Sequence, residues 1–517
     1  MKTILNFIKK NRNIILLIIS FVFLTMLVLG MTYAYFDLKT GGETESTMNI
    51  GGAEISATYS FSNSINITDA LPGNDIIAYK DITLTYKNTS SEEYKVYLKT
   101  VIDYSTFTNT ENDGVLYYDI YSGTDHSTLV QDKTIFPTIK YGKSILKEIS
   151  IPANSTGTLN YRINFYFPES DKLQNPDGQL VLNASISVES DKSLKYTPTL
   201  LKKINLMYQY DSETNGLEQD DTTDKNIRYT GANPKNYVEF ANTGELWRIV
   251  GVFNVKDSTG KIERKIKLVR DESLGGFSWD AKLNPQTNDY RGINDWTEAD
   301  LMKELNGDYL DTTLTANKTN WYNSYWDSST DKPVLRQTGV FDYTKVIKSN
   351  YQNMISESVW NIGGNSYSNP TTPPWGLPLL DQYNKERGTI TFQNSRPTEW
   401  TGKVGLIYAS DYGYASTNSE CRENLRAGVT YDKANDKWDY TNGKCKTDNW
   451  LAKSNWYWTL SPFSGNSHSV FHVRGGAAVH GHYAYDSNSV WPAVFLKSDI
   501  LIASGTGEKE SPYKLSL

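Results

Sequence analysis

The tryptophans of this 517-residue chain all lie in one part of the sequence, which limits how the chain can fold. There are thirteen, and each lies between Trp247 and Trp491. Large aromatic side chains gather where a core is built, because each buries much apolar area. A chain of this length also exceeds what one core usually supports. We therefore expect an N-terminal segment over residues 1–36, a domain over 45–190, a polar linker over 191–198 and a second domain over 199–517.

The N-terminal segment has the composition of a signal peptide or a transmembrane helix. Four basic residues precede an uncharged, mostly apolar run over residues 14–31. Such a run can cross a bilayer as a helix with its basic end in the cytoplasm. Small residues at Thr32 and Ala34 also predict a signal-peptidase site, with cleavage after Ala34. A retained anchor and a cleaved signal both stay open, and both place the rest of the chain at the outer side of the cell membrane or in a secreted form.

The first domain is predicted to be an all-β sandwich of the jelly-roll kind. Apolar and polar residues alternate in several short runs, for example over residues 82–86 and 161–167. This period of two places one face of each strand on a core and the other in water. Turn-forming residues separate the runs, at residues 71–75, 87–91 and 152–155.

The second domain is predicted to be α+β. Residues 246–253 and 265–270 read as a β-hairpin around a polar turn at 257–260. A first helix is expected after Thr297, which would cap it, and a second over about 343–360, where Val346 and Met354 belong to one apolar stripe. Residues 312–331 and 364–378 read as long loops, and residues 402–408 as a strand.

A recognition surface is predicted within residues 456–496. Four of the five histidines lie there, and residues 461–494 contain no Lys, Glu, Gln, Met, Leu, Ile or Thr. A biased surface between core-like flanks is typical of a binding site on a rigid scaffold. Tyr457 is expected to oppose Trp456 and Trp458 on a strand and to face the ligand. The predicted ligand-binding residues are Tyr457, His468, His472, Arg474, His480, His482, Tyr483, Tyr485, Asp486, Asn488 and Trp491.

Neither a metal ion nor another cofactor is expected at these histidines. A zinc or copper site is conceivable, but Asp486 is the one acidic residue nearby and no cysteine lies in the stretch. Exposed contact residues are the favoured interpretation. Binding would then depend on pH near roughly pH 6 to 7, where histidine titrates.

Part of the first region resembles the TasA/camelysin family of exported biofilm-fibre and surface proteins of Gram-positive bacteria. The matching features are residues 30–36 (GMTYAYF), the turn 71–73 (LPG) and Asn88 at the end of the strand that follows. The resemblance covers about residues 20–190 and implies a jelly-roll domain that can assemble by donating a strand to a neighbour. Camelysin has been described as a metalloprotease, but His126 is the one histidine of this region, and a catalytic zinc needs about three protein ligands.

The second region resembles bacterial surface domains with a C-type-lectin-like fold related to the formylglycine-generating enzymes. The resemblance covers about residues 240–517, although the group usually has Arg where this chain has Trp491. The same fold carries the variable proteins of diversity-generating retroelements, whose mutated segments have nearly the residue alphabet of 461–490. It therefore implies a diversified surface, with ordinary drift of a loop as the alternative. The matching segments are 246–249 (LWRI), 408–415 (YASDYGYA), 458–462 (WTLSP), 491–498 (WPAVFLKS) and the closing 504–513.

Charge and motifs exclude several classes of function. The formal net charge of −7 disfavours nucleic acid as a partner, since phosphate binding needs a basic face. No G-x-S-x-G, P-loop or G-x-G-x-x-G pattern occurs, so we expect no enzyme. Cys421 and Cys445 are the two cysteines, and in an exported chain such a pair is expected to form a disulfide.

The favoured function is an adhesin-like surface protein whose second domain binds an extracellular protein or glycan non-covalently. The membrane is a further expected partner, through the N-terminal helix. A structural subunit of a surface or biofilm fibre, self-assembling through the sandwich domain, is the alternative. An enzyme of the formylglycine-generating fold comes third.

Overall fold

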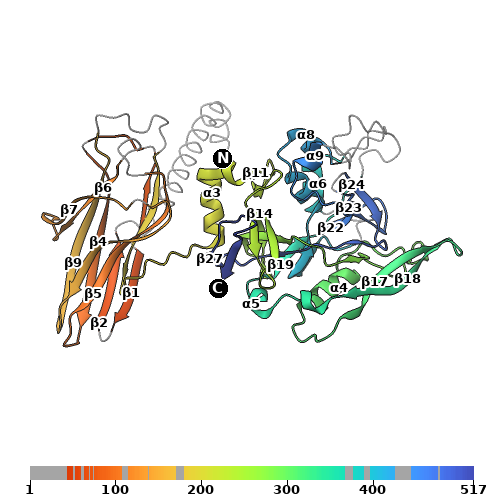
Figure 1. The fold of residues 1–517 in the computed structure, drawn as a ribbon, viewed down its shortest axis with the longest axis horizontal. Coiled ribbons are helices and arrows are strands. Elements are labelled where there is room, and N and C mark those ends of the chain that lie inside the picture. The colour runs from red at the N-terminus through yellow and green to blue at the C-terminus, as the bar shows by residue number, and fades with distance from the viewer. Residues whose placement is uncertain are drawn as a thin grey trace, which may run out of the picture. The chain divides into compact units, whose positions relative to one another are not determined.

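A computed structural model describes residues 44–50, 53–59, 63–68, 70–73, 75–107, 115–137, 139–169, 180–366, 377–388, 396–425, 444–475 and 478–517 (Figure 1). The chain divides into two compact units, Met1–Tyr196 and Thr197–Leu517. The predicted export segment, with its cleavage site at Ala34, lies outside the described residues. Within those residues, no helix has both the length and the apolar character needed to span a membrane.

The first unit is a β-sandwich, as the alternating runs predict. Its described strands form two antiparallel sheets whose inner faces share one core (Figure 1). Ile163 and Phe165 of one sheet and Leu98 and Ile186 of the other are fully buried in it. One sheet has the order β1 (Thr44–Ile50), β2 (Ala53–Tyr59), β4 (Ile76–Asn88), β9 (Ser155–Tyr166), β6 (Tyr117–Ser122) and β7 (Thr128–Ile135). The other has the order β3 (Ser64–Ile67), β10 (Leu182–Glu189), β5 (Tyr94–Ser105) and β8 (Gly142–Ile151).

Asn88 links two turns at one end of the sandwich. Its side chain is buried, and its amide donates hydrogen bonds of 2.9 Å to the carbonyls of Glu92 and Pro152. Its side-chain oxygen accepts from the backbone N–H of Ser90. A buried amide with these partners fixes how the two turns close, because an unpaired polar group would be costly there.

The second unit contains two larger sheets and two two-stranded sheets among its described residues (Figure 1). The first sheet has the order β21 (Val404–Leu406), β26 (Pro492–Phe495), β15 (Ile262–Arg270), β14 (Leu246–Lys256), β13 (Tyr237–Glu239), β28 (Tyr513–Ser516) and β27 (Leu501–Ser504), with β12 (Ile227–Tyr229) beside β14 and β11 (Leu217–Gln219) beside β12. The second has the order β16 (Gly276–Phe277), β25 (Asn488–Ser489), β22 (Tyr457–Pro462), β23 (Ser469–Val473) and β24 (Val479–Tyr483). The two-stranded sheets are the hairpin of β17 (Lys318–Asp327) with β18 (Lys332–Phe341) and the pair of β19 (Ser358–Asn361) with β20 (Glu399–Gly402).

Short helices connect these strands. The predicted hairpin of β14 and β15 is confirmed, and Gly260 in its turn has φ +88°, a conformation that glycine adopts easily. The sequence analysis missed the first and longest described helix of the unit, α3, which Thr199 caps through its side chain. The helices are α3 (Leu200–Asn215), α4 (Asp300–Asn306), α5 (Ser349–Gln352), α6 (Leu379–Glu386), α7 (Ala409–Tyr414), α8 (Ser419–Glu423) and α9 (Lys444–Thr447), with 3₁₀ turns η1 (Asp308–Leu310) and η2 (Tyr343–Lys345).

Three local predictions in this unit were wrong. The helix expected over 343–360 is broken into η2, α5 and β19, because residues 358–361 pair with β20 and tertiary pairing overrides the apolar stripe. Thr297 does not cap α4, since its hydroxyl and N–H both bond to Asp295. The loop expected over 312–331 contains β17, which pairs with β18.

A buried charge network holds α7 against the larger sheet. Arg228 on β12 donates to Asp220 and to Asp411, each at 2.7 Å, and Lys267 on β15 donates to Asp411 at 2.6 Å. Because these cations face the carboxylate of Asp411, its pKa is lowered to about 2 despite burial. Asp411 also accepts from the backbone N–H of Tyr408 at the start of α7.

Candidate ligand-binding surface

The β23–β24 hairpin brings three of the predicted histidines to one face of the smaller sheet. His472 lies directly opposite His480, and His482 is two residues further along β24. Successive side chains of a strand point to opposite faces, so His480 and His482 share the face of His472. His472 also pairs with Trp458 on β22.

Trp456 and Arg474 complete this group of rings. The ring centroids of His472 and His482 are 4.7 Å apart with nearly parallel planes, and Trp456 lies 5.2 Å from His472 and 5.9 Å from His482. The guanidinium of Arg474 lies 4.9 Å from the Trp456 ring, within the range of a cation–π contact. We call Trp456, His472, Arg474, His480 and His482 the histidine cluster.

Burial and neighbouring bases hold His472 in its neutral form. Its side chain is 1% exposed, and desolvation together with His482, His480 and Arg474 lowers its pKa well below the usual 6.5. Its Nδ1 has no hydrogen-bond partner among the described residues. His482 has a different surrounding, because it is half-buried and its Nδ1 contacts the carboxylate of Asp486.

A second group of rings lies at the end of β24, where alternation directs Tyr483 to the face opposite that of His482. Tyr483 stacks on Tyr485 at 5.7 Å and lies 5.3 Å from His468. Arg291 approaches the Tyr483 ring to 5.2 Å and the Trp326 ring, on the β17 hairpin, to 5.8 Å. Desolvation and Arg291 lower the pKa of His468, so this ring is also mainly neutral near pH 7.

A hollow of about 370 Å³ opens beside β24. It is lined by Phe463, Asn466, Ser469, Gly481, His482 and Tyr483. The hollow is within the size range of small-ligand sites. Its lining combines an aromatic ring, an amide, a hydroxyl and an imidazole, which can pack against a ligand and exchange hydrogen bonds with it.

The predicted site residues separate into an accessible set and a buried set. Within the described residues, His468, Arg474, His480, His482, Tyr483 and Asp486 are exposed or half-buried. Ligand binding by them stays a prediction. Buried instead are Tyr457, His472, Tyr485, Asn488 and Trp491.

The expectation that Tyr457 faces the ligand was wrong. It is 1% exposed, and its hydroxyl donates to the Leu451 carbonyl at 2.9 Å. β22 is an inner strand between β25 and β23, and α7 packs against both β22 and β23. The strand is therefore covered on both faces, and alternation along it does not lead to an exposed face.

Trp491 and Tyr485 also pack into the unit. Trp491 makes an edge-to-face contact with Tyr457 at 4.8 Å, just before β26. Trp491 thus holds the start of β26 against the smaller sheet. The carbonyl of Tyr485 accepts a hydrogen bond from the Ser278 hydroxyl. The ring of Tyr485 stacks against the ring of Tyr483.

Three residues of this surface were not predicted from the sequence. Trp456 is 40% exposed because it precedes β22, Trp326 is 43% exposed on the β17 hairpin, and Arg291 lies between Trp326 and Tyr483. The aromatic run 456–458 could have indicated Trp456, had the end of the strand been known. Nothing in the sequence places Arg291 or Trp326 beside residue 483.

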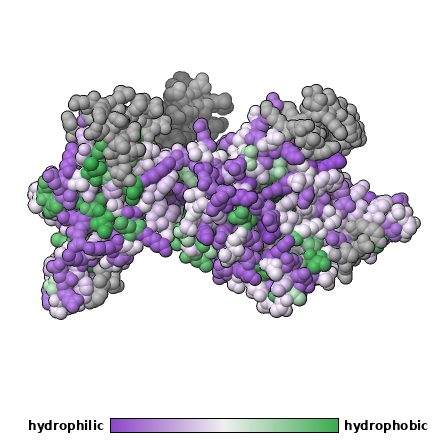
Figure 2. All heavy atoms as spheres, viewed as in Figure 1, coloured by the Kyte–Doolittle hydropathy of each residue, from purple (hydrophilic) through white to green (hydrophobic). Residues whose placement is uncertain are grey.

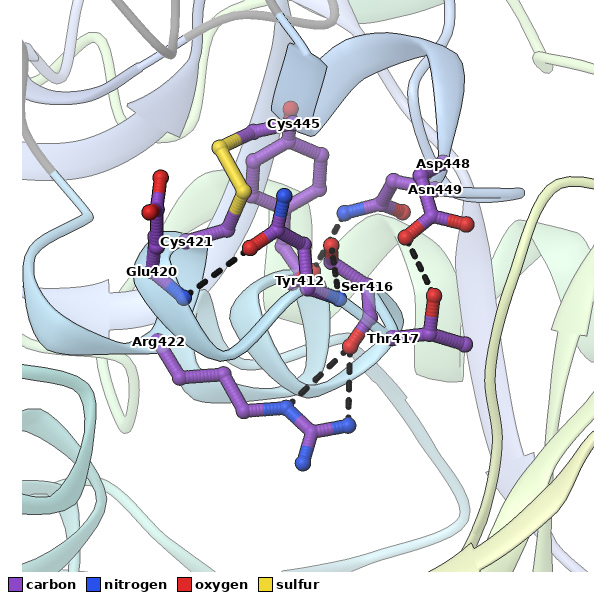
Figure 3. Close-up of a disulfide and its surroundings, with 10 residues drawn as sticks. Tyr412, Ser416, Thr417, Glu420, Cys421, Arg422, Cys445, Asp448 and Asn449 are labelled. Atoms are coloured by element: carbon purple, nitrogen blue, oxygen red, sulfur yellow. Dashed lines mark hydrogen bonds between the residues drawn. A yellow bond between two sulfur atoms is a disulfide. The ribbon is translucent and has the colours of Figure 1, made fainter.

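The predicted disulfide is present near this surface. Cys421 on α8 and Cys445 on α9 are bonded and fully buried (Figure 3). Arg422, next in the chain, donates to the Ser416 carbonyl and pairs with Glu218. The bond closes a loop of 24 residues whose ends are thereby fixed against the core.

Within the described residues, no group of three or more His, Cys, Asp and Glu side chains is arranged to hold a metal ion. His472 and His482 stack with their ring centroids 4.7 Å apart, and His480 lies edge-to-face with His472 at 6.4 Å. Metal-bound imidazoles instead direct their nitrogens at a common point about 2 Å away.

Comparisons with known proteins assign no family to the chain. It matches no protein-family model and no curated protein significantly. Among solved structures, the xylan-binding domain CBM22-2 of Xyn10C from Paenibacillus barcinonensis is 13% identical, covers 29% of this chain and 89% of its own, and has a TM-score of 0.13. AvmM, which catalyses macrocyclization in alchivemycin A biosynthesis, is 12% identical, covers 26% and 92%, and has a TM-score of 0.11. Similarities at these TM-scores support no assignment of fold or function.

Proposed function

We propose that this chain is an exported surface protein of a Gram-positive bacterium and that its Thr197–Leu517 unit binds a glycan non-covalently, as an adhesin does. The observation that carries the proposal is the surface of the β23–β24 hairpin. The exposed rings of Trp456, just before β22, and of Tyr483 flank His482 at the edge strand β24, with centroids 5.9 and 6.1 Å from the imidazole. Glycan recognition needs such aromatic faces together with hydrogen-bonding groups.

The chemistry of this surface favours a polar ligand. Sugar rings present apolar C–H faces to aromatic side chains and hydroxyls to polar ones. Trp456 and Tyr483 are 40% and 37% exposed and can supply the first contact. Asp486, Asn466 and the accessible imidazoles can supply the second.

A protein ligand is less well supported. A stable protein interface buries about 800 Å² on each partner and has an apolar centre. The exposed rings here are separated by histidines and charged groups and do not form a continuous apolar patch, and Tyr483 lines the hollow beside β24. On the face of this unit drawn in Figure 2, hydrophobic residues form only small separate patches among hydrophilic ones.

A lectin-like frame with a diversified surface is part of the proposal. Among the described residues of 461–490, accessible positions lie between runs of buried scaffold positions, such as Ser469–Val473 on β23. Diversification would preserve the fold only where side chains are accessible. Comparison of this gene with close relatives tests this idea. We expect differences at the codons for residues 468, 474, 480, 482 and 483, and few differences at the codons for buried residues. Differences spread evenly over both sets would argue against targeted diversification.

A non-enzymatic role is supported by the state of the cysteines. Formylglycine-generating chemistry requires a reactive thiol, and the sulfurs of Cys421 and Cys445, the two cysteines of this chain, are bonded and buried. A thiolate, the reactive form, needs access and deprotonation.

Binding of the full chain to printed arrays tests the proposal. One array carries defined oligosaccharides and a second carries extracellular proteins. We expect retention on a subset of oligosaccharides that share a terminal residue. Retention on proteins alone would replace the glycan by a protein ligand, and no retention on either array would contradict the recognition function.

Assembly through the first unit is the second candidate, because its sheets have open edges. β1 and β7 lie at the two edges of one sheet, and β3 and β8 at the edges of the other. Such edges present unpaired backbone groups that can accept a strand from another copy. Electron microscopy of the concentrated full chain should show filaments if this candidate holds. A chain that sediments as a monomer at the same concentration would count against it.

A further inference from the structure

A second hollow, of about 460 Å³, lies over the larger sheet of the Thr197–Leu517 unit. It shares no lining residue with the histidine cluster or with the hollow beside β24. Its walls come from β14, β15, α6 and the start of α7, which belong to the packed core of the unit. A pocket built on such elements keeps its shape when empty.

Arg387 and Lys267 are two of the cations that line this hollow, and Arg387 has unused hydrogen-bond donors. Arg387, just after α6, has a side chain that is 20% exposed, and among the described residues it donates one hydrogen bond, to the Tyr383 carbonyl at 3.3 Å. A guanidinium has five N–H donors, so most of them are free for a ligand. Lys267 in the floor is fully buried and donates to Asp411, so it acts on the hollow through its charge.

The acidic groups around Arg387 neutralise it incompletely. Asp224 lies 3.8 Å away and already accepts a hydrogen bond from the Tyr383 hydroxyl at 2.5 Å. Glu386 lies 3.7 Å away, but burial raises its pKa, which weakens it as a counter-ion. Glu399 at the rim is paired with Lys256 at 2.7 Å. The position in front of Arg387 is therefore suited to a negative charge.

The position of Arg387 is fixed before a ligand arrives. Its guanidinium stacks on the Tyr383 ring at 3.5 Å and lies 5.2 Å from the Tyr408 ring. A planar guanidinium held in this way can bind a carboxylate through two parallel hydrogen bonds. Lys267 lies 4.1 Å from the Tyr408 ring, and desolvation, with Arg387 nearby, lowers its pKa to about 8. A bound anion would offset that repulsion.

The other lining groups match a hydroxylated ligand. Phe253 and Phe495 contribute apolar wall, while Asn254, Asn361 and Asn384 contribute carboxamides. A carboxamide donates and accepts, as a hydroxyl does. The hollow is of a size to hold one or two sugar rings.

We propose that this hollow binds a small acidic sugar, with the carboxylate on Arg387 and the hydroxyls on the surrounding asparagines. The site is separate from the histidine cluster, so this proposal can be tested independently of the proposed function. Lys267 strengthens binding by its charge.

Calorimetric titration of the full chain tests the proposal with sodium glucuronate, glucose and inorganic phosphate as probes. We expect glucuronate to bind about tenfold or more tightly than glucose, since a charge-assisted bidentate pair is absent from glucose. Phosphate should also bind about tenfold more weakly, because it lacks the sugar ring. Equal affinities for glucuronate and glucose, or for glucuronate and phosphate, would overturn the assignment, as would the absence of any glucuronate binding.

Variants locate the binding. The Arg387→Gln variant should lose about tenfold or more in glucuronate affinity. The Arg387→Lys variant should lose less, because it keeps the positive charge but not the paired N–H donors of the guanidinium. Asn384→Ala removes an exposed amide and should weaken glucuronate and glucose alike. Arg162→Gln, the same substitution at a surface ion pair with Asp81 in the Met1–Tyr196 unit, is the matched control and should bind glucuronate as the parent does. Near-ultraviolet circular dichroism verifies folding, and a folded Arg387→Gln variant with unchanged affinity would contradict the proposal.

Discussion

Glu304 is a buried carboxyl whose ionisation works against the fold. Burial raises its pKa to about 9 from the ordinary 4.5, and the backbone N–H of Tyr322 donates to one of its oxygens while the other has no partner among the described residues. Because the pKa of Glu304 is higher in the folded state than in the unfolded state, Glu304 contributes to the free energy of unfolding. This contribution is fully present below pH 4.5 and is lost as the pH rises toward 9. The folded state therefore becomes less stable across this interval.

Substituting Glu304→Gln should remove this loss. The amide keeps an oxygen for Tyr322 and cannot ionise, so at pH 7.5 the variant should exceed the parent in unfolding free energy by on the order of 4 kcal/mol. At pH 4.5 the two should be nearly equal. Urea unfolding at both pH values measures the difference. Glu298→Gln, at an exposed position on the same segment, should change neither value.

His472 gives the opposite dependence on pH. Its folded-state pKa is depressed, so stability is full above the unfolded value near 6.5 and is lost as the pH falls toward the folded pKa. Between pH 6.5 and 5.5 the loss approaches about 1 kcal/mol. His472→Phe, which fills the ring position without a basic nitrogen, should be less sensitive to acid in this interval. An identical acid-side slope in variant and parent would show that His472 carries no such penalty.

At the scale of single elements, period-two patterns predicted strands well and the helical stripe less well. The alternating residues around Ile82 and Ile163 form β4 and β9 because one sheet face is buried and the other wet. The stripe of Val346 and Met354 is buried as expected, yet the segment bends through α5 into β19. Apolar spacing shows which side chains enter a core, whereas pairing with β20, some 40 residues away, decides the backbone.

The candidate surface was predictable in part for the same reason. Composition located the hairpin that carries His468, His480 and His482, because its bias does not depend on knowing the fold. Exposure does depend on the fold. Tyr457 was therefore predicted to be exposed, although it lies buried on the inner strand β22. Arg291 and Trp326 reach the surface from distant segments, through contacts that no local pattern encodes.

The disulfide between α8 and α9 should contribute measurably to stability. For a loop of 24 residues, the chain-entropy estimate is about 3 kcal/mol. A Cys421→Ser/Cys445→Ser double variant, which leaves no free thiol, should lose about that much in urea unfolding. The same loss should appear in the parent after reduction with dithiothreitol, and no loss in either experiment would mean that packing alone fixes the two helices.

For the whole molecule, two separate hydrophobic cores predict two cooperative transitions. One core lies within the Met1–Tyr196 unit and the other within Thr197–Leu517. Each unit exceeds 100 residues and holds its own core, which is enough for independent folding. Differential scanning calorimetry should resolve two transitions, and Glu304→Gln at pH 7.5 should move only one of them. A single transition that shifts as a whole would contradict this division.

The central claim for the molecule is recognition through the rings of the β23–β24 hairpin. The most direct test measures the affinity of the full chain for the oligosaccharide it retains best on the array, in parent and in Trp456→Ala and Tyr483→Ala variants. Each variant should lose about 1 kcal/mol or more of binding free energy, and the double variant more, because each deletes an exposed ring. Leu380→Ala, at a position as exposed as Trp456, is the control and should bind as the parent does. Parental affinity in the folded double variant would contradict the claim.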